Sequence, residues 1–587
     1  MGKRKKKKRA ARPKHSRSPE EVAYDVAEEK RRQRRLAIAA AVLVLGVQIT
    51  ATVMALSPAP HNGGDNAGYL SLAHSLVTHG SYVEQWDPEA RPHTKYPPVY
   101  PTILAGAMLL GAEGWGAFKA ISVFFVVVSV FVTFLWALDR RGPRFALVLA
   151  LLLAFSPAVL WSSRWILSDP PFLALTLFTL WAFHRVDREP ASPAWLWAGG
   201  AAAILATFTR TAGLPLVLAV GGWLALERRW KSLAIFGAAF ALPSGLWWMR
   251  GQRSGGAEYV SEFWKINPYD PDLGNVGVGG LVSRIFENLN GYVFTHIPAG
   301  LAPYEGGGVL AALGLALVSA AVVGWGLRLR RERTVTELFT PLYFGLILAW
   351  PTVWSGDRFA LPLYPLLLFY AGEALVDGAR HLHRRLPWAV AALAVTVLGI
   401  PAVRAWSGLV REASVCSRVV ETRGPFGCYS PGFQEFTLAA RWVGENLPDG
   451  AAVFTRKPRI FYTLSGVPSR TYPLSQDPEN FFREAREAGV EYVVMDRVDQ
   501  LGALYVGPVV GARPEAFCNL IAVRGGDGGQ TAILAILPAD ASEVPADDSV
   551  QSEMVIQACP ANMVRDVARE LPPYSASLLP LLALPRP

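Results

Sequence analysis

Apolar segments of near membrane-spanning length recur between residues 36 and 404, and short arginine-rich connections separate them. This pattern constrains the fold more than any other feature, because a bilayer core of about 30 Å requires roughly 20 helical residues for each crossing. We therefore predict a polytopic α-helical membrane domain over residues 36–404. Its expected spans, eleven in all, are 36–57, 117–138, 145–161, 171–183, 193–209, 213–226, 232–249, 306–327, 337–354, 358–376 and 386–403.

The chain carries a formal net charge of +10, and much of it lies in residues 3–17, KRKKKKRAARPKHSR. A basic run can bind nucleic acid, but this one is too short and too uniform to form a binding domain. At the head of a membrane protein it is better explained as a cytoplasmic tail, residues 1–35, that fixes orientation and contacts anionic membrane lipids. We expect no nucleic-acid partner. We also expect no cleavable signal, because segment 36–57 is longer than the apolar part of a signal peptide.

Charge predicts the sidedness of the connections. If the N-terminus is cytoplasmic, every second connection is cytoplasmic too, and each of these is basic: 139–144, 184–190, 227–231, 328–333 and 377–385. This alternation follows the positive-inside rule and predicts a multi-pass protein of the cytoplasmic membrane. It requires that the short apolar run 100–112 does not cross, so we expect it as a helix at the outer interface. The outer face then displays two large loops, 58–116 and 250–305.

Residues 405–587 alternate expected strands and helices, which indicates a small extracytoplasmic α/β domain. Helices are expected at 434–447 and 479–489, and strands at 451–455, 491–495, 517–523 and 531–537.

All four cysteines of the chain lie in this C-terminal region, which suits two disulfides in an oxidising compartment. Three pairings are possible, and we choose Cys416 with Cys428 and Cys518 with Cys559. The absence of a CxxC spacing argues against a zinc site. The histidines of the outer loops also lack a metal-ligand spacing, so we assign no metal ligands and no cofactor, although a divalent metal stays possible.

The first outer loop holds a carboxylate and a phenol on one expected helical face. Asp65 precedes the helical run 66–78, and Tyr69 lies within that run, four residues after Asp65. Asp65 is either the N-cap of this helix or a general base acting on an acceptor hydroxyl. Further along the loop, Lys95 and Tyr96 begin a proline-rich segment; Lys95 either meets an anion or snorkels to the headgroups.

Three more charged residues stand at outer ends of the expected spans. Asp169 precedes two prolines, and is either a helix cap or a second active-site acid. Arg210 and Arg358 are arginines that the positive-inside rule does not require, and a guanidinium at this depth suits a lipid phosphate. The alternative for Arg358 is a salt bridge with Asp357 or with another carboxylate.

The order of these motifs resembles the GT-C superfamily of integral membrane glycosyltransferases, and most of all its protein O-mannosyltransferase and lipid A aminoarabinose transferase branch. After Asp65 and Tyr69, the segments that carry the likeness are KYPPVYP at 95–101, SDP at 168–170, GDRFALP at 356–362 and WVGENLPDG at 442–450. The likeness covers nearly the whole chain beyond residue 35. One departure from many protein mannosyltransferases is that Asp65 is followed by Asn66, which leaves the acceptor open.

The resemblance implies inverting transfer of a sugar from a polyprenyl-phosphate donor to a lipid, glycan or protein acceptor outside the cytoplasmic membrane. By position, Asp65 would be the catalytic carboxylate and Asp169 the second active-site acid. Lys95, Arg358 and Arg210 would bind the donor phosphate, and Tyr69 and Tyr96 would contact substrate. The rival hypotheses are a lipid or glycan transporter or flippase, and a non-catalytic scaffold with an exported binding domain. Only the enzyme requires the four groups Asp65, Asp169, Lys95 and Arg358 to converge.

Overall fold

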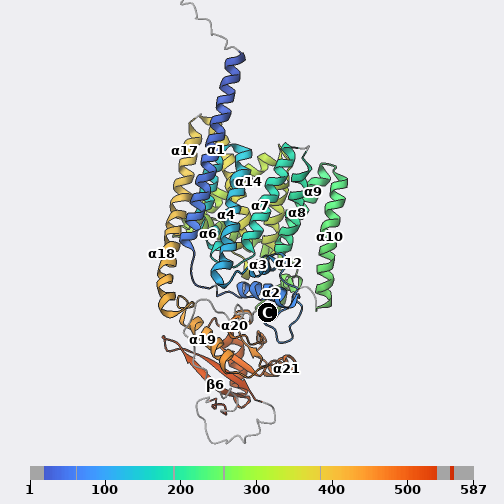
Figure 1. Cartoon of the computed structure of the whole chain (residues 1–587), viewed down its shortest axis with the longest axis vertical. Helices are drawn as coiled ribbons and strands as arrows, with labels where there is room; N and C mark the ends of the chain where they lie inside the picture. The colour runs from blue at the N-terminus through green and yellow to red at the C-terminus, as the bar shows by residue number, and fades with distance from the viewer. Residues whose placement is uncertain are drawn as a thin grey trace, which may run out of the picture.

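A computed structural model describes residues 19–60, 62–189, 192–254, 258–383, 385–537 and 556–560 of the chain. The basic run 3–17 lies outside the described residues. Helices form a bundle, and a smaller C-terminal unit lies at the end of the bundle opposite to the start of α1 (Figure 1).

Every segment predicted to span the membrane is helical. The helices are α1 (Pro19–Ala55), α4 (Gly114–Arg141), α5 (Pro143–Ala154) with α6 (Pro157–Ser163), α7 (Asp169–Arg188), α8 (Pro193–Thr209), α9 (Leu214–Leu226), α10 (Trp230–Arg253), α14 (Gly307–Leu329), α15 (Val335–Ala349), α16 (Tyr364–Leu382), and α17 (Leu386–Ala394) running through η5 (Val395–Gly399) into α18 (Ile400–Arg423).

Six of the described helices are long and apolar enough to cross a membrane, or up to seven if the bent pair α5 and α6 forms one span. The other predicted spans correspond to shorter or less apolar helices, so the count of eleven is not confirmed. The chain is nonetheless a multi-pass membrane protein by this criterion. Its core is packed between α4, α7 and α16, where Phe134, Trp136, Phe369 and Tyr370 are buried.

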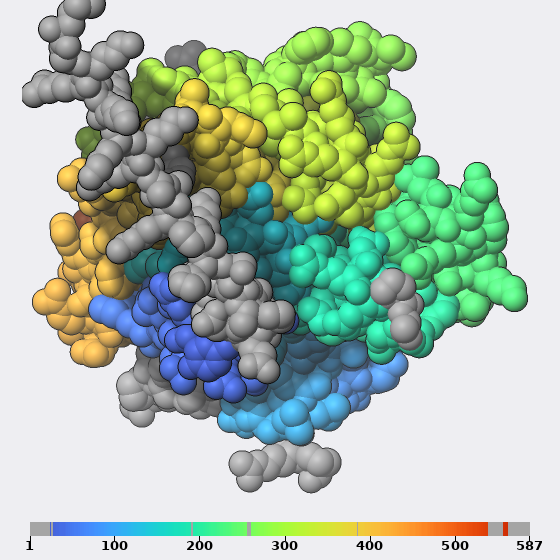
Figure 2. Space-filling model, turned by 90° about the horizontal axis from the view of Figure 1, so that it is seen from above, coloured from blue at the N-terminus to red at the C-terminus, as the bar shows by residue number. Residues whose placement is uncertain are grey.

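Helix α10 lies at the edge of the bundle, as the views from the side and from above both show (Figures 1 and 2). Its large apolar side chains, among them Leu242, Leu246 and Trp248, are exposed. An apolar helix that packs so little against its own chain is suited to a lipid environment, where such side chains need no protein partner.

The first outer loop contains two helices, α2 (Gly64–His79) and α3 (Val99–Leu109). Both lie between the bundle and the C-terminal unit (Figure 1). The 11 residues of α3 reach only about 16 Å, which is too short to cross a bilayer. The predicted run 100–112 is therefore a short helix at this end of the bundle.

The second outer loop folds into further short elements. These are α11 (Glu258–Trp264), the antiparallel strands β1 (Lys265–Asn267) and β2 (Asp270–Asn275), α12 (Val278–Gly291), η2 (Tyr292–His296) and α13 (Ile297–Leu301). Short helical turns connect some helices of the bundle. Between α8 and α9 lies η1 (Thr211–Gly213), and between α15 and α16 lie η3 (Thr352–Trp354) and η4 (Asp357–Leu363).

The C-terminal unit contains one mixed sheet with the order β4-β3-β5-β7-β6. Strand β3 is parallel to β4 and β5, whereas β7 is antiparallel to β5 and β6. The elements are α19 (Pro431–Asn446), β3 (Val453–Phe454), α20 (Pro458–Ser465), β4 (Ser469–Arg470), α21 (Pro478–Ala488), β5 (Tyr492–Met495), η6 (Gly502–Val506), α22 (Gly507–Ala512), η7 (Pro514–Ala516), β6 (Phe517–Arg524) and β7 (Gln530–Ile536).

A continuous helix joins this unit to the bundle. Helix α18 is continuous across the domain boundary placed at residue 404, so the two parts share a helix rather than a loop. Both disulfides are present with the pairing chosen from the sequence, Cys416 with Cys428 and Cys518 with Cys559. The first of them ties α18 to the segment that precedes α19.

The C-terminal unit also forms hydrogen bonds with the first outer loop. Arg470 of β4 donates to both carboxylate oxygens of Asp87, at 3.0 and 2.7 Å. The backbone N–H of Ser469 donates to the carbonyl of Trp86 at 2.6 Å. Because Asp87 is almost fully buried, this bidentate pair holds the loop and the C-terminal unit together at close range.

Candidate active site

The candidate site is built around Asp65, which stands in the first turn of α2. Gly63 is the N-cap of this helix, and no side chain caps it, so the reading of Asp65 as an N-cap is wrong. One carboxylate oxygen instead accepts from the Tyr96 hydroxyl at 2.7 Å, and the other accepts from Arg358 Nη1 at 3.2 Å. The carboxylate thus does not cap the helix and is held between a phenol and a guanidinium.

Arg358 joins this carboxylate to the second predicted acid. It begins η4 with Asp357, and its Nε donates to Asp169 Oδ2 at 2.9 Å. Asp169 starts α7, whose N-cap is Ser168 with no side-chain cap, so Asp169 is not a cap either. Arg358 thus pairs with two carboxylates other than Asp357, and its assignment to the donor phosphate stays a prediction.

Arg210 completes the cluster at the far side of Asp169. Its Nη1 lies 2.7 Å from Asp169 Oδ2 and donates to Ser168 Oγ at 3.3 Å. The Tyr69 hydroxyl lies 2.8 Å from the same Ser168 oxygen. The rings of Tyr69 and Tyr96 are 4.7 Å apart, so both predicted tyrosines line the cluster beside the two acids.

Exposure separates the two acids. The Asp65 side chain is 37% exposed and that of Asp169 only 4%. Asp65 can therefore meet a substrate, whereas Asp169 lies behind Arg358 and Arg210 and holds these two guanidiniums in place. This division was not visible in the sequence, where both residues were expected to act as catalytic acids.

Lys95 takes a different position. Its ammonium pairs with Glu262 of α11 and lies 5.6 Å from the ring centroid of Trp354. Lys95 is adjacent to Tyr96 and therefore near the cluster, but its pairing partner comes from the second outer loop. Of the four groups expected to converge, Asp65, Asp169 and Arg358 are in direct contact.

The C-terminal unit contributes a residue that sequence reasoning missed. Arg459 of α20 donates to the Tyr96 hydroxyl, and its Nη1 lies 3.9 Å from Asp65 Oδ1. The guanidinium also lies over the rings of Trp86 and Tyr96. The basic segment 456–459 was the only sequence feature that could have pointed to this arginine. A basic turn in a soluble domain does not by itself indicate a contact with a site at the membrane.

Gly68 of α2 allows this arginine to approach. A Cβ atom at position 68 would lie 3.0 Å from Arg459 Cδ and 3.4 Å from Tyr96 Cε2, which is closer than side chains normally pack. The absence of a side chain at this one helical position therefore lets α20 lie against α2.

Electrostatics keep Asp65 ionised. Burial acts to raise the pKa of Asp65, but the charges of Arg358 and Arg459 and the hydrogen bond from Tyr96 outweigh it and hold the pKa below its ordinary value. Burial, reinforced by the Asp65 charge, raises the pKa of Tyr69 to about 12. The site thus presents a permanent carboxylate beside a tyrosine that keeps its proton.

The formal charges around the two acids do not cancel. Three guanidiniums, from Arg210, Arg358 and Arg459, face two carboxylates. In the described part of the chain, no group of three or more His, Cys, Asp and Glu side chains is placed to hold a metal ion. The surplus positive charge makes this cluster suited to an incoming anion.

A family model described as dolichyl-phosphate-mannose-protein mannosyltransferase matches residues 95–248. The oligosaccharyltransferase of Archaeoglobus fulgidus, tethered with an acceptor peptide, aligns with 14% identity over 84% of this chain and 74% of its own, with a TM-score of 0.52. ArnT from Cupriavidus metallidurans, bound to undecaprenyl phosphate, aligns with 14% identity over 85% of this chain and 98% of its own, with a TM-score of 0.50.

The chain has the GT-C fold. The resemblance inferred from its motifs is thereby confirmed, and at 14% identity the property shared with these structures is the fold. A third GT-C structure, AglB from Archaeoglobus fulgidus in complex with an inhibitory peptide and a dolichol-phosphate, aligns with 14% identity over 86% of this chain and 75% of its own, with a TM-score of 0.50. The comparison with curated proteins gives no match.

Proposed function

We propose that this GT-C protein is an inverting glycosyltransferase that moves a sugar from a polyprenyl-phosphate donor to an acceptor on the outer face of the cytoplasmic membrane. The observation that carries the proposal is the contact of Asp65 with Arg358 and Arg459 at the end of the bundle. A partly exposed carboxylate and an excess of guanidiniums are the two features that such a transfer needs.

The similar proteins support the donor class. The matching family model is described by its dolichyl-phosphate-mannose donor, ArnT is bound to undecaprenyl phosphate, and AglB is bound to a dolichol-phosphate. These lipids share one phosphate on a polyprenyl chain. We therefore assign a polyprenyl-phosphate sugar to this chain, with a lipid, glycan or protein as acceptor.

In the proposed reaction Asp65 accepts the proton of the acceptor hydroxyl while that oxygen attacks the anomeric carbon. The bond from the anomeric carbon to the phosphate oxygen breaks, and the polyprenyl phosphate leaves with the electron pair. Arg358 and Arg210 stabilise this leaving group, because guanidiniums fixed in a partly dry site cost little reorganisation when charge develops. A phosphate that leaves as an anion needs no acid, so one base is sufficient.

The phosphate would replace a carboxylate as partner of Arg358. Arg358 forms ion pairs with both Asp65 and Asp169. If the donor phosphate takes the contact now made to Asp65, the carboxylate loses a positive neighbour and becomes a stronger base. Binding of the donor would in this way prepare the base for the acceptor.

The convergence of Asp65, Asp169 and Arg358 argues against the two rival functions. A scaffold has no need for these residues to meet. A transporter is expected to place ionisable groups near the midplane between repeated halves, whereas these three lie where α2, α7 and η4 begin, at one end of the bundle.

Transfer assays in membranes with defined polyprenyl-phosphate sugars test the function. We expect Asp65→Asn to lower the transfer rate at least about 100-fold, the scale of a lost general base. Asp272→Asn, a change at an exposed carboxylate of β2, serves as the matched control and should retain wild-type transfer. Near-normal transfer by Asp65→Asn would exclude the base role, and movement of labelled lipid without any sugar transfer by the wild type would favour a flippase.

A further inference from the structure

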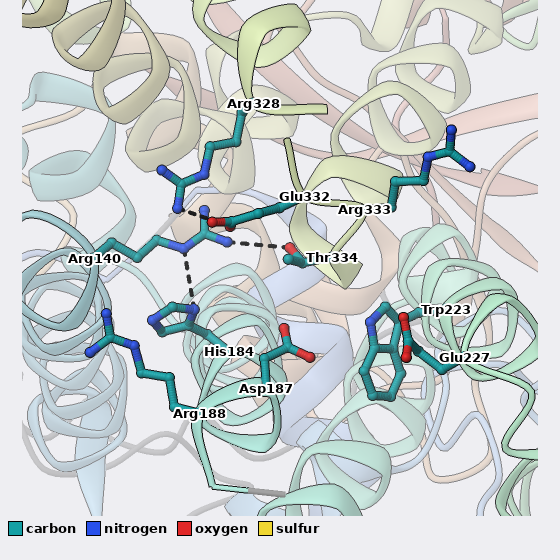
Figure 3. Close-up of a pocket in the computed structure, with 10 residues that line it drawn as sticks. All are labelled: Arg140, His184, Asp187, Arg188, Trp223, Glu227, Arg328, Glu332, Arg333 and Thr334. Atoms are coloured by element: carbon teal, nitrogen blue, oxygen red, sulfur yellow. Dashed lines mark hydrogen bonds and ion pairs between the residues drawn. The ribbon is translucent and has the colours of Figure 1, made fainter. Parts of the chain in front are cut away.

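A second polar site lies at the other end of the bundle. Helix α7 begins with Asp169 and ends at Arg188, about 28 Å further along its axis. At that end a cavity of about 400 Å³ opens between the ends of α4, α7, α9 and α14 and the segment before α15 (Figure 3). Its lining residues are Arg140, His184, Asp187, Arg188, Trp223, Glu227, Arg328, Glu332, Arg333 and Thr334.

Two residues that line the cavity, His184 and Arg328, each have a buried N–H group without an acceptor. His184 is buried, and its Nδ1 faces the Arg140 Nε–H at 3.5 Å. Because Nδ1 accepts, the proton of the neutral ring is on Nε2, and this buried atom has no hydrogen-bond partner. Arg328 Nε is buried and unpartnered in the same way. Leaving a buried donor without an acceptor is costly, so a ligand that supplies acceptors to these two N–H groups would be stabilised by them.

The charged groups near these two donors are already balanced. Arg140 pairs with Glu337 at 3.2 Å, and both side chains are fully buried. Arg328 pairs with Glu373 at 2.6 Å and with Glu332 at 3.1 Å. This part of the lining is thus pre-organised by ion pairs that do not use the two unpartnered N–H groups.

The rim of the cavity carries charges of both signs. Arg188 and Arg333 are exposed cations, and Asp187 and Glu227 are exposed carboxylates. Within the described residues none of these four has an ion-pair partner. A simple anion would satisfy the donors but would be repelled by the two carboxylates. A ligand with both an anionic and a cationic group satisfies all of them.

We propose that this cavity binds a zwitterionic phosphate ester with a primary amine, the chemistry of a phosphoethanolamine headgroup. The phosphate accepts from His184 Nε2, Arg328 Nε and the rim arginines. The ammonium donates to Asp187 and Glu227. This assignment does not depend on the transfer reaction proposed above, because it concerns the opposite end of the bundle.

Binding to the purified full-length protein in detergent tests the proposal by native mass spectrometry. The probes are short-chain phosphatidylethanolamine, phosphatidylglycerol of the same chain length, inorganic phosphate and free phosphoethanolamine. We expect phosphatidylethanolamine to bind at least about tenfold more tightly than phosphatidylglycerol, the difference of one charged hydrogen bond. Competition by free phosphoethanolamine would show that the headgroup alone suffices, and its failure that the acyl chains are required; both support the zwitterion site.

Variants locate the binding and keep the proposal falsifiable. Glu227→Gln and Arg188→Ala change exposed rim residues and should each weaken phosphatidylethanolamine binding about tenfold. Arg331→Ala, an exposed arginine of the same basic segment that does not line the cavity, should leave it unchanged. Equal affinity for phosphatidylglycerol or inorganic phosphate, unchanged binding in both rim variants, or no binding of any probe would each overturn the proposal.

Discussion

At the scale of single residues, the site depends on which neighbours contact the carboxylate of Asp65. Asp65 contacts Arg358 from the bundle, Arg459 from the C-terminal unit and Tyr96 from its own loop. These neighbours hold its pKa below the ordinary value against the opposing effect of burial. The charge state of the proposed base is therefore set by two different parts of the molecule.

This arrangement predicts an effect of Arg459 on the pH dependence of transfer. The carboxylate is the active form, so activity is lost only as pH falls through the lowered pKa of Asp65. Arg459→Gln removes one neighbouring cation, raises that pKa and should shift the acid limb of the kcat/KM profile, which reports the free enzyme, to higher pH by ~1 unit. Arg483→Gln, on an exposed face of α21, is the control. An acid limb that stays in place in Arg459→Gln would show that this arginine does not set the charge of Asp65.

At the scale of elements, the close approach of α2 and α20 decides whether Arg459 can reach the site. Gly68 provides the space, because a Cβ there would meet Arg459 Cδ at 3.0 Å. The α2 helix itself is fixed from the bundle side, where Asn66 accepts from the Ile166 backbone N–H at 2.7 Å. Because this hydrogen bond opposes a shift of α2, we expect the side chain of Arg459 to be displaced by a Cβ at position 68.

Gly68→Ala should therefore reduce transfer about tenfold while the protein folds normally, since alanine favours a helix and only the arginine is displaced. Gly106→Ala on α3 is a matched change, because a Cβ at position 106 meets no atom within 4 Å. It should leave transfer unchanged. Transfer assays and thermal unfolding of both variants check this, and wild-type activity of Gly68→Ala would show that the Arg459 contact is dispensable.

At the scale of the whole molecule, the five basic connections meet at one end. Arg140, His184, Glu227 and Arg333 line one cavity, and Arg141 pairs with Asp377 of the fifth connection. The Asp65 cluster and the C-terminal unit lie at the opposite end (Figure 1). The alternation of charge that we used to orient the chain therefore corresponds to two physical faces of the bundle.

Orientation in the membrane follows from the positive-inside rule and can be measured. The native cysteines are paired in disulfides, so a single introduced cysteine can be labelled selectively. With a membrane-impermeant maleimide we expect Glu487→Cys, on the exposed face of α21, to react in intact cells. Arg331→Cys should react only after the membrane is permeabilised. The reverse pattern would invert the proposed topology and place the Asp65 site in the cytoplasm.

The sequence by itself determined the helical segments, the order of the motifs and the clustering of basic connections on one face. These properties are local, because the apolar length of a segment and the charges at its ends decide whether and how it inserts. Asp65, Asp169 and Arg358 were also recognisable, since charged residues at outer span ends are few. The sequence did not determine the number of membrane crossings. Helices such as α9 and α15 are shorter than a bilayer requires, so their apolar length alone does not decide whether they cross.

Only the tertiary structure decided which of these charges meet. Asp65 and Arg358 are 293 residues apart, and Tyr96 and Arg459 are 363 apart. No periodicity or spacing encodes such pairs, because they form where helix ends and a separately folded unit are brought together by packing. The pair between Lys95 and Glu262 of another loop forms for the same reason. Arg459 likewise reaches the site from the C-terminal unit, where no sequence motif indicated an active-site residue.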